Sequence, residues 1–190
     1  MFAELLKIII NIVKINKNFF LNNRTFGEAS IYFAISIVII SSLISIIPNT
    51  AFLEFMDSRF NLGEIAGPSI RSVLIGSAIL WIIKTTYLYF VGVILFPNKN
   101  TKCNFRKVFI LVGYAHVLFF FNFLIINPYL LVLSLITYIW YNAALIVGIN
   151  IIFNYKNLIK SSLIVLAPFI IILIIIISQN FGSHSNITLS

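Results

Sequence analysis

Residues 102–160 decide the fold. They read KCNFRKVFI LVGYAHVLFF FNFLIINPYL LVLSLITYIW YNAALIVGIN IIFNYKNLIK. A basic run at residues 102–107 opens this stretch, and the basic pair Lys156 and Lys160 closes it. Both halves are predominantly apolar, and Asn127-Pro128 between them is typical of a turn. Two apolar spans with positive charge at their open ends predict a helical hairpin through a membrane.

Composition extends this interpretation to the whole chain. Hydrophobic residues make up 61% of the 190 residues and charged residues 9%, whereas soluble domains carry about 45–50% apolar and about 25% charged residues. Lipid is therefore the solvent for most of the chain, and backbone polar groups must be satisfied by helices or by a closed barrel. Barrel strands alternate apolar and polar residues. The tracts here are continuously apolar, which predicts an all-α, polytopic membrane protein.

Five apolar segments are long enough to cross a bilayer, which takes roughly 20 residues. They are residues 26–47, 70–96, 106–126, 129–153 and 158–177. Together they form a predicted five-span membrane domain at residues 26–177. A polar C-terminal tail follows at residues 178–190.

The N-terminal residues 1–25 differ from the spans. Apolar residues recur at helical spacing between residues 2 and 20, with Glu4, Lys7 and Lys14 on the other side. This pattern predicts an amphipathic helix followed by a turn. Such a helix lies in the membrane interface, although docking on the other helices explains the pattern equally well.

The distribution of lysine and arginine predicts the orientation, because these residues favour cytoplasmic loops. Ten of them lie on the N-terminal side of the predicted spans: Lys7, Lys14, Lys17, Arg24, Lys99, Lys102, Arg106, Lys107, Lys156 and Lys160. Arg59 and Arg71 lie on the other side. We therefore expect a cytoplasmic N-terminus and an outer C-terminus.

A few polar residues inside the spans are the candidate functional residues. They are Lys84, Tyr114, His116, Asn142 and Asn150. A charge within a span is costly, so Lys84 suggests function, but a lysine near a span end can also extend its ammonium to the interface. Partners for Lys84 would be carbonyls, tyrosines or lipid phosphate. The other four could line a polar seam, and hydrogen bonding between helices explains them without transport.

Several classes of function are disfavoured. The spans contain no acid pair and no nucleophile with a base, so we expect no enzyme and no catalytic residues. The single cysteine, Cys103, has no metal-ligand spacing with a histidine, and we expect neither a metal nor another cofactor. Although the net charge is +8, the basic residues flank apolar segments, which argues against nucleic acid as a partner.

Short motifs in the second half of the chain resemble the Yip family of five-span membrane proteins, whose eukaryotic members interact with Rab/Ypt GTPases. Residues 105–108 (FRKV) and 112–115 (VGYA) look like the family's basic-aromatic entry and Gly-Tyr-Ala step. Residues 140–148 look like its fourth span, which ends in a glycine. Residues 154–155 (NY) and 158–168 look like its short loop and fifth span. The likeness is to the prokaryotic branch; it implies five spans with the N-terminus inside, and no reaction.

Two functions remain open. The first is a non-enzymatic integral membrane protein that organises or contacts other membrane components, with the lipid bilayer, other membrane proteins or a homo-oligomer as partners. The alternative is a small permease or channel component with a polar path near Lys84 and His116. High Ile, Asn, Lys and Phe content is typical of an AT-rich bacterial genome and favours a bacterial cytoplasmic (inner) membrane.

Overall fold

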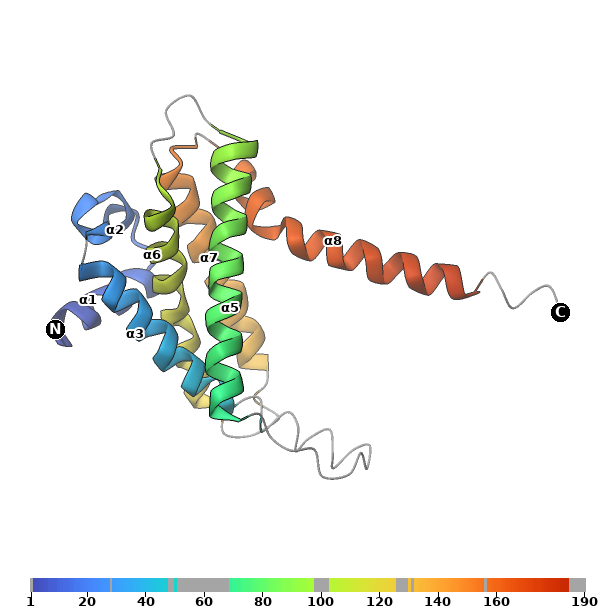
Figure 1. Cartoon of the computed structure of the whole chain (residues 1–190), viewed down its shortest axis with the longest axis horizontal. Coiled ribbons are helices and arrows are strands. Elements are labelled where there is room, and N and C mark those ends of the chain that lie inside the picture. Colours follow the sequence, from blue (N-terminus) through green and yellow to red (C-terminus); the bar gives the residue numbers. More distant parts are fainter. Residues whose placement is uncertain are drawn as a thin grey trace.

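The computed structural model describes residues 2–27, 29–47, 50, 69–97, 103–125, 130, 132–155 and 157–184. All regular structure in these ranges is helical (Figure 1), which confirms the all-α prediction for this part of the chain. The predicted turn at Asn127-Pro128 lies outside the described residues. So do four members of the charge count: Arg59, Lys99, Lys102 and Lys156.

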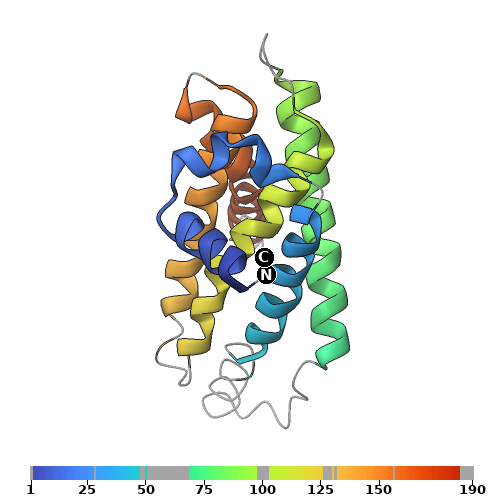
Figure 2. The same ribbon diagram turned by 90° about the vertical axis from the view of Figure 1, so that its left-hand side faces the viewer.

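The core is a bundle of four helices. These are α3 (Ala29–Ile44), α5 (Ile70–Tyr89), α6 (Phe105–Ala115) and α7 (Val132–Ile152). Helix α6 lies at the centre, because it packs against each of the other three. Its residues from Ile110 to Ala115 are all buried. The order of the helices in the bundle can be followed in Figures 1 and 2.

Three helical stretches are long and apolar enough to cross a membrane, namely Ile70–Leu95, Phe105–Leu124 and Val132–Ile152. Two further apolar helices, Ala29–Ile44 and Leu158–Ile171, are shorter over the residues that could be assessed. The chain is thus a multi-pass membrane protein, and the predicted count of five requires these two helices to cross as well.

The central helix tightens halfway along its length. Helix α6 passes at His116 into the 3₁₀-helix η3 (His116–Leu124). The backbone N–H of His116 bonds to Gly113, so Val112 lacks its usual α-helical donor. The His116 ring replaces that donor, since its Nδ1 lies 2.7 Å from the Val112 carbonyl oxygen. A carbonyl only accepts, so Nδ1 carries the hydrogen.

Helix α5 ends in a π-helix, η2 (Phe90–Leu95), whose Gly92 lies against the ring of Phe153, directly after α7. A Cβ on Gly92 would overlap the Phe153 ring, so only glycine allows this approach. The Tyr155 hydroxyl lies within hydrogen-bonding distance of the Gly92 and Phe96 carbonyl oxygens. It thereby stabilises carbonyls at the irregular helix end, where the regular α-helical pattern is lost.

The N-terminal segment forms two helices where the sequence pattern predicts one. Helix α1 (Phe2–Val13) stops and α2 (Lys17–Leu21) begins after Asn16. Ile15 adopts a φ of 47°, and the N–H groups of Ile15 and Asn16 bond back to Ile12 and Asn11. This is the Schellman ending of a helix. The Asn16 side chain then caps α2 by accepting from the Asn18 N–H.

Helices α1 and α2 dock on the bundle. Helix α1 packs on α6 and η3, and α2 packs on α7. Ile8 and Ile12 are buried, while Lys7 and Lys14 are exposed. The contacts of α1 and α2 therefore agree with the alternative in which the N-terminal segment docks on the other helices. The position of this segment relative to the membrane surface stays a prediction.

Among the side chains of α8 (Leu158–His184) that the structure describes, the buried ones lie in its first half. Ser161, Ile164 and Val165 are buried, whereas Phe169 and Ile171 are exposed. The helix leaves the bundle on the side opposite α1 and α2 (Figure 1). It continues past Ile177, where the sequence predicts the end of the fifth span.

Candidate binding cavity

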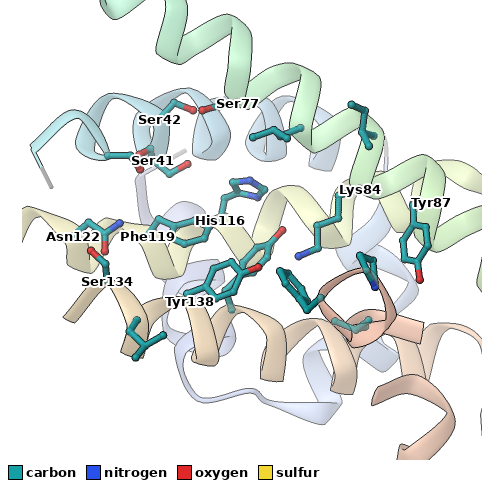
Figure 3. A pocket seen from close by; sticks show the side chains of 18 residues that line it. Ser41, Ser42, Ser77, Lys84, Tyr87, His116, Phe119, Asn122, Ser134 and Tyr138 are labelled. Carbon is teal, nitrogen blue, oxygen red and sulfur yellow. Dashed lines mark hydrogen bonds between the residues drawn. The ribbon is translucent and has the colours of Figure 1, made fainter. Parts of the chain in front are cut away.

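A cavity of about 960 Å³ lies between the bundle and the start of α8 (Figure 3). Its walls come from α3, α5, η3, α7 and α8. Polar side chains line part of it: Ser41, Ser42, Ser45, Ser77, Lys84, Tyr87, His116, Asn122, Ser134, Tyr138 and Tyr141. Small-molecule pockets span about 300–1,000 Å³, so this cavity is large enough for a ligand.

Lys84 extends from α5 toward α7 and α8. Its Nζ donates to Asn142 Oδ1 at 3.3 Å. It also lies 4.2 Å from the centre of the Tyr141 ring and 5.9 Å from that of Phe169. The ammonium thus rests on two aromatic faces and one amide oxygen, which attract a cation without neutralising it.

Asn142 positions Lys84. The Asn142 Nδ2 donates to the Tyr138 carbonyl oxygen at 2.9 Å, one turn earlier on α7. This bond turns Oδ1 outward to accept from Lys84. The Asn142 side chain is itself buried, so its two hydrogen bonds are made away from water.

Of the five candidate residues, Lys84 and His116 line the cavity and Asn142 contacts Lys84. The ring of His116 packs edge-on against Tyr141, the same ring that lies under Lys84. These three residues come from three different helices, and the tertiary structure brings them together.

The other two candidates lie elsewhere. Tyr114 faces the N-terminal segment, where its ring is 6.0 Å from that of Phe19. Asn150 lies at the end of α7, with its amide 3.0 Å from Ser161 Oγ on α8. With its nitrogen toward the loop, Asn150 also reaches the carbonyl oxygens of Tyr155 and Asn157 at 3.2 Å. Both residues therefore join helices and take no part in the cavity.

The serines of α3 are cavity residues that the sequence did not indicate as such. Ser41, Ser42 and Ser45 lie on one face of α3 and all line the cavity. Each hydroxyl donates to a carbonyl of its own helix, at 2.6–2.9 Å. The available signal was their spacing of three and four residues, which places polar groups on one side of an otherwise apolar helix.

Proline in α8 shapes the cavity wall. Pro168 lacks an N–H, so the carbonyl of Ile164 has no donor from its own helix. The Tyr87 hydroxyl of α5 donates to this oxygen at 2.9 Å. The bond attaches α8 to α5 at the point beyond which α8 leaves the bundle.

The cavity is partly open, and its lining residues end before the α7–α8 loop. Its rim carries Leu80, Ile83, Leu135 and Phe169, which are exposed apolar side chains. Beyond Tyr87 and Tyr141 the helices contribute no lining residue. There the fully buried Phe153 packs against Gly92.

In the described ranges, no cluster of three or more His, Cys, Asp or Glu residues could hold a metal ion.

The fold and the cavity define a class: a multi-pass helical membrane protein with a polar pocket inside its bundle.

The family follows from comparison with known proteins. The family model of the Yip1 domain matches residues 14–179, which is most of the chain. The chain belongs to the Yip1 family, as its motifs suggested. Comparisons with curated proteins and with solved structures find no match.

Proposed function

We propose that this Yip1-family protein is non-enzymatic and acts by binding another component of the membrane in the cavity beside Lys84. One observation carries the proposal: the cavity opens through exposed apolar side chains and holds a lysine in its interior. A component already dissolved in the bilayer can enter such an opening without crossing water.

The topology that supports this function has five spans, formed by α3, α5, α6 with η3, α7 and α8. The starts of α6 and α8 lie at one end of the molecule, and α3 runs from the middle of the bundle toward the opposite end (Figure 1). The end at which α6 and α8 start is the cytoplasmic one in our proposal, because it collects most of the positive charge. The composition and the prokaryotic likeness favour a bacterial inner membrane, with the C-terminus outside.

Helix α2 lies toward that charged end, and α1 packs nearer the middle of the bundle, on α6 and η3 (Figure 1). Lys7, Lys14 and Lys17 are exposed, and exposed lysines interact favourably with an anionic cytoplasmic leaflet. The segment would thereby contact both the bundle and the membrane interface. Organising other membrane proteins, including a second copy of the chain, is part of the same proposal.

Transport is the second candidate, because Lys84 and His116 line one cavity. Closure by Phe153 and Gly92 argues for a binding site over a continuous path. Replacement of Lys84 by leucine separates the two. A permease would lose solute flux in membrane vesicles and cells would grow more slowly, whereas unchanged flux and growth would count against transport.

Photocrosslinking in native membranes tests the main proposal. A photoreactive phenylalanine analogue at Leu135, on the cavity rim, should capture a reproducible component. The same analogue at Tyr32, an exposed position on α3 outside the cavity lining, is the matched control. Equal labelling from both positions, or none from Leu135, would contradict the proposed function.

A further inference from the structure

We propose that the cavity binds the anionic headgroup of a membrane amphiphile, with its phosphate or carboxylate paired to Lys84. This inference rests on the proposed function and names the ligand class. It follows from the charge of Lys84, from the polarity along the cavity and from a buried hydroxyl that has no partner among the described residues.

The charge of Lys84 is not balanced by the described part of the protein. Within the described ranges the only acid is Glu4, on α1, and α1 packs on the side of the bundle opposite α8 (Figure 1). The ammonium has three donors, and one of them meets Asn142 Oδ1. Because an unpaired charge away from water is costly, an anion at this position would gain both charge pairing and hydrogen bonds.

The Tyr138 hydroxyl is a second donor for the same anion. Figure 3 shows this hydroxyl and the Lys84 ammonium directed into the cavity from opposite walls. Lys84 comes from α5 and Tyr138 from α7, so an anion between them would be held by two helices. A neutral headgroup could use the hydroxyl but would leave the ammonium unpaired.

The cavity has a polar part and an apolar part, which match the headgroup and the acyl chain of an amphiphile. One part is lined by hydroxyl and amide groups of α3, η3 and α7, including Ser41 and Asn122. The rim is formed by apolar side chains such as Leu80 and Leu135. A headgroup in the polar part would let an acyl chain leave over the rim into the surrounding hydrocarbon.

Ser134 gives an independent indication of an occupant. Its Oγ is buried and has no hydrogen-bond partner among the described residues, although it lines the cavity. Buried hydroxyls nearly always have a partner. A further polar group of the headgroup, such as a hydroxyl or an ester oxygen, would supply one.

Native mass spectrometry of the purified full chain tests the inference directly. The probes are phosphatidylglycerol, the neutral lipid diacylglycerol with identical acyl chains, and inorganic phosphate. We expect the anionic lipid to bind the wild-type protein about tenfold or more tighter than the neutral lipid, which has no phosphate to pair with Lys84; this is the size typical of a charge-assisted hydrogen bond. Inorganic phosphate should neither bind nor compete at similar concentrations.

Three variants locate the effect. Lys84→Met should abolish the preference for the anionic lipid, while Lys84→Arg keeps the charge and should retain most of it. Arg71→Met removes one positive charge at an exposed residue of α5 outside the cavity lining and should bind like the wild type. Size-exclusion profiles and circular dichroism establish that each variant is folded.

Four outcomes would overturn the inference. They are equal binding of the two lipids by the wild type, an unchanged preference in Lys84→Met, loss of the preference in Arg71→Met, and binding of inorganic phosphate as tight as that of the lipid. The comparison of the two lipids on the wild-type protein needs no variant, so it tests the inference even if Lys84→Met fails to fold. If the photoreactive group at Leu135 captured a neutral component, the ligand would not be anionic and this inference would be wrong. The proposed function, binding of a membrane component, would still hold.

Discussion

The two sides of the central helix, α6 with η3, are packed in opposite ways. On the side of α1 and α3, Ile12, Ala34 and Val117 are completely buried. On the side of α5, α7 and α8, the η3 half of the same central helix borders a cavity of about 960 Å³, and the end of α3 also contributes to its lining. Both sides are built from strongly apolar helices, so overall hydrophobicity does not explain the difference.

Residue size and polarity at the contacts explain it. On the closed side Gly113 meets Ala34, and a Cβ on Gly113 would lie 2.7 Å from the Ala34 Cβ. Small residues let helix backbones approach closely in a membrane. On the open side Lys84 and Pro168 line the cavity, and α8 leaves the bundle. The comparison teaches that a few side chains decide which interface closes.

The largest expected effect comes from breaking the closed side. Gly113→Ala should lower the free energy of unfolding by about 1–3 kcal/mol, because the new methyl group overpacks the contact with Ala34. Thermal unfolding in detergent measures it.

The control for that variant is Gly76→Ala on α5. A Cβ there would have no atom within 4 Å, so stability should stay the same or rise slightly. Equal losses in Gly113→Ala and Gly76→Ala would show that the close contact with Ala34 is not what stabilises this side.

The attachment of α8 on the open side is expected to be weaker. Tyr87→Phe should cost about 1 kcal/mol, because the Ile164 carbonyl loses its donor. In a Pro168→Leu background the new backbone N–H can bond to Ile164, so Tyr87→Phe should then cost less. The free energies of unfolding of the wild type, Tyr87→Phe, Pro168→Leu and the double variant form a double-mutant cycle. Additive effects would mean that the hydroxyl does not compensate for the proline.

The remaining prediction concerns a group outside both sides, and its effect is on reactivity. Burial raises the pKa of the Cys103 thiol from 9.0 to about 12, although the charge of Lys107 acts to lower it. The folded thiol therefore stays protonated at pH 9, and alkylation by iodoacetamide should be on the order of a hundredfold slower than in the protein unfolded by SDS.

The same pKa shift has a consequence for stability. As pH rises, the thiol loses its proton in the unfolded protein before it does so in the folded protein. The contribution of Cys103 to the free energy of unfolding is therefore fully present below pH 9.0 and is lost as pH approaches about 12. The rate of alkylation against pH measures both ends of this window. Equal rates in folded and SDS-unfolded protein at pH 9 would contradict the assignment.

Much of the secondary structure could be predicted because apolar length is a strong signal in a membrane protein. The segments at residues 70–96 and 129–153 were placed within a few residues of the observed helices. The breaks inside helices were not predicted. The stop at Ile15 and the change to a 3₁₀-helix at His116 depend on hydrogen bonds to particular carbonyls, which an apolar pattern does not reveal.

The candidate site was predictable only as a set of residue types. Lys84, His116 and Asn142 stood out as polar residues in spans, and so did Tyr114 and Asn150. Helices that are apolar on every side carry no pattern that predicts their rotation. The sequence therefore could not indicate that Tyr114 faces α2 and that Asn150 holds the α7–α8 loop.

By itself, the sequence determined that this chain is helical, that it lies in a membrane and that it belongs to the Yip1 family, because length, apolarity and short motifs are local properties. Only the tertiary structure decided which side of the central helix is closed and that Lys84 enters a cavity. These depend on contacts between residues far apart in the chain, where the size of one side chain decides how closely two helices approach.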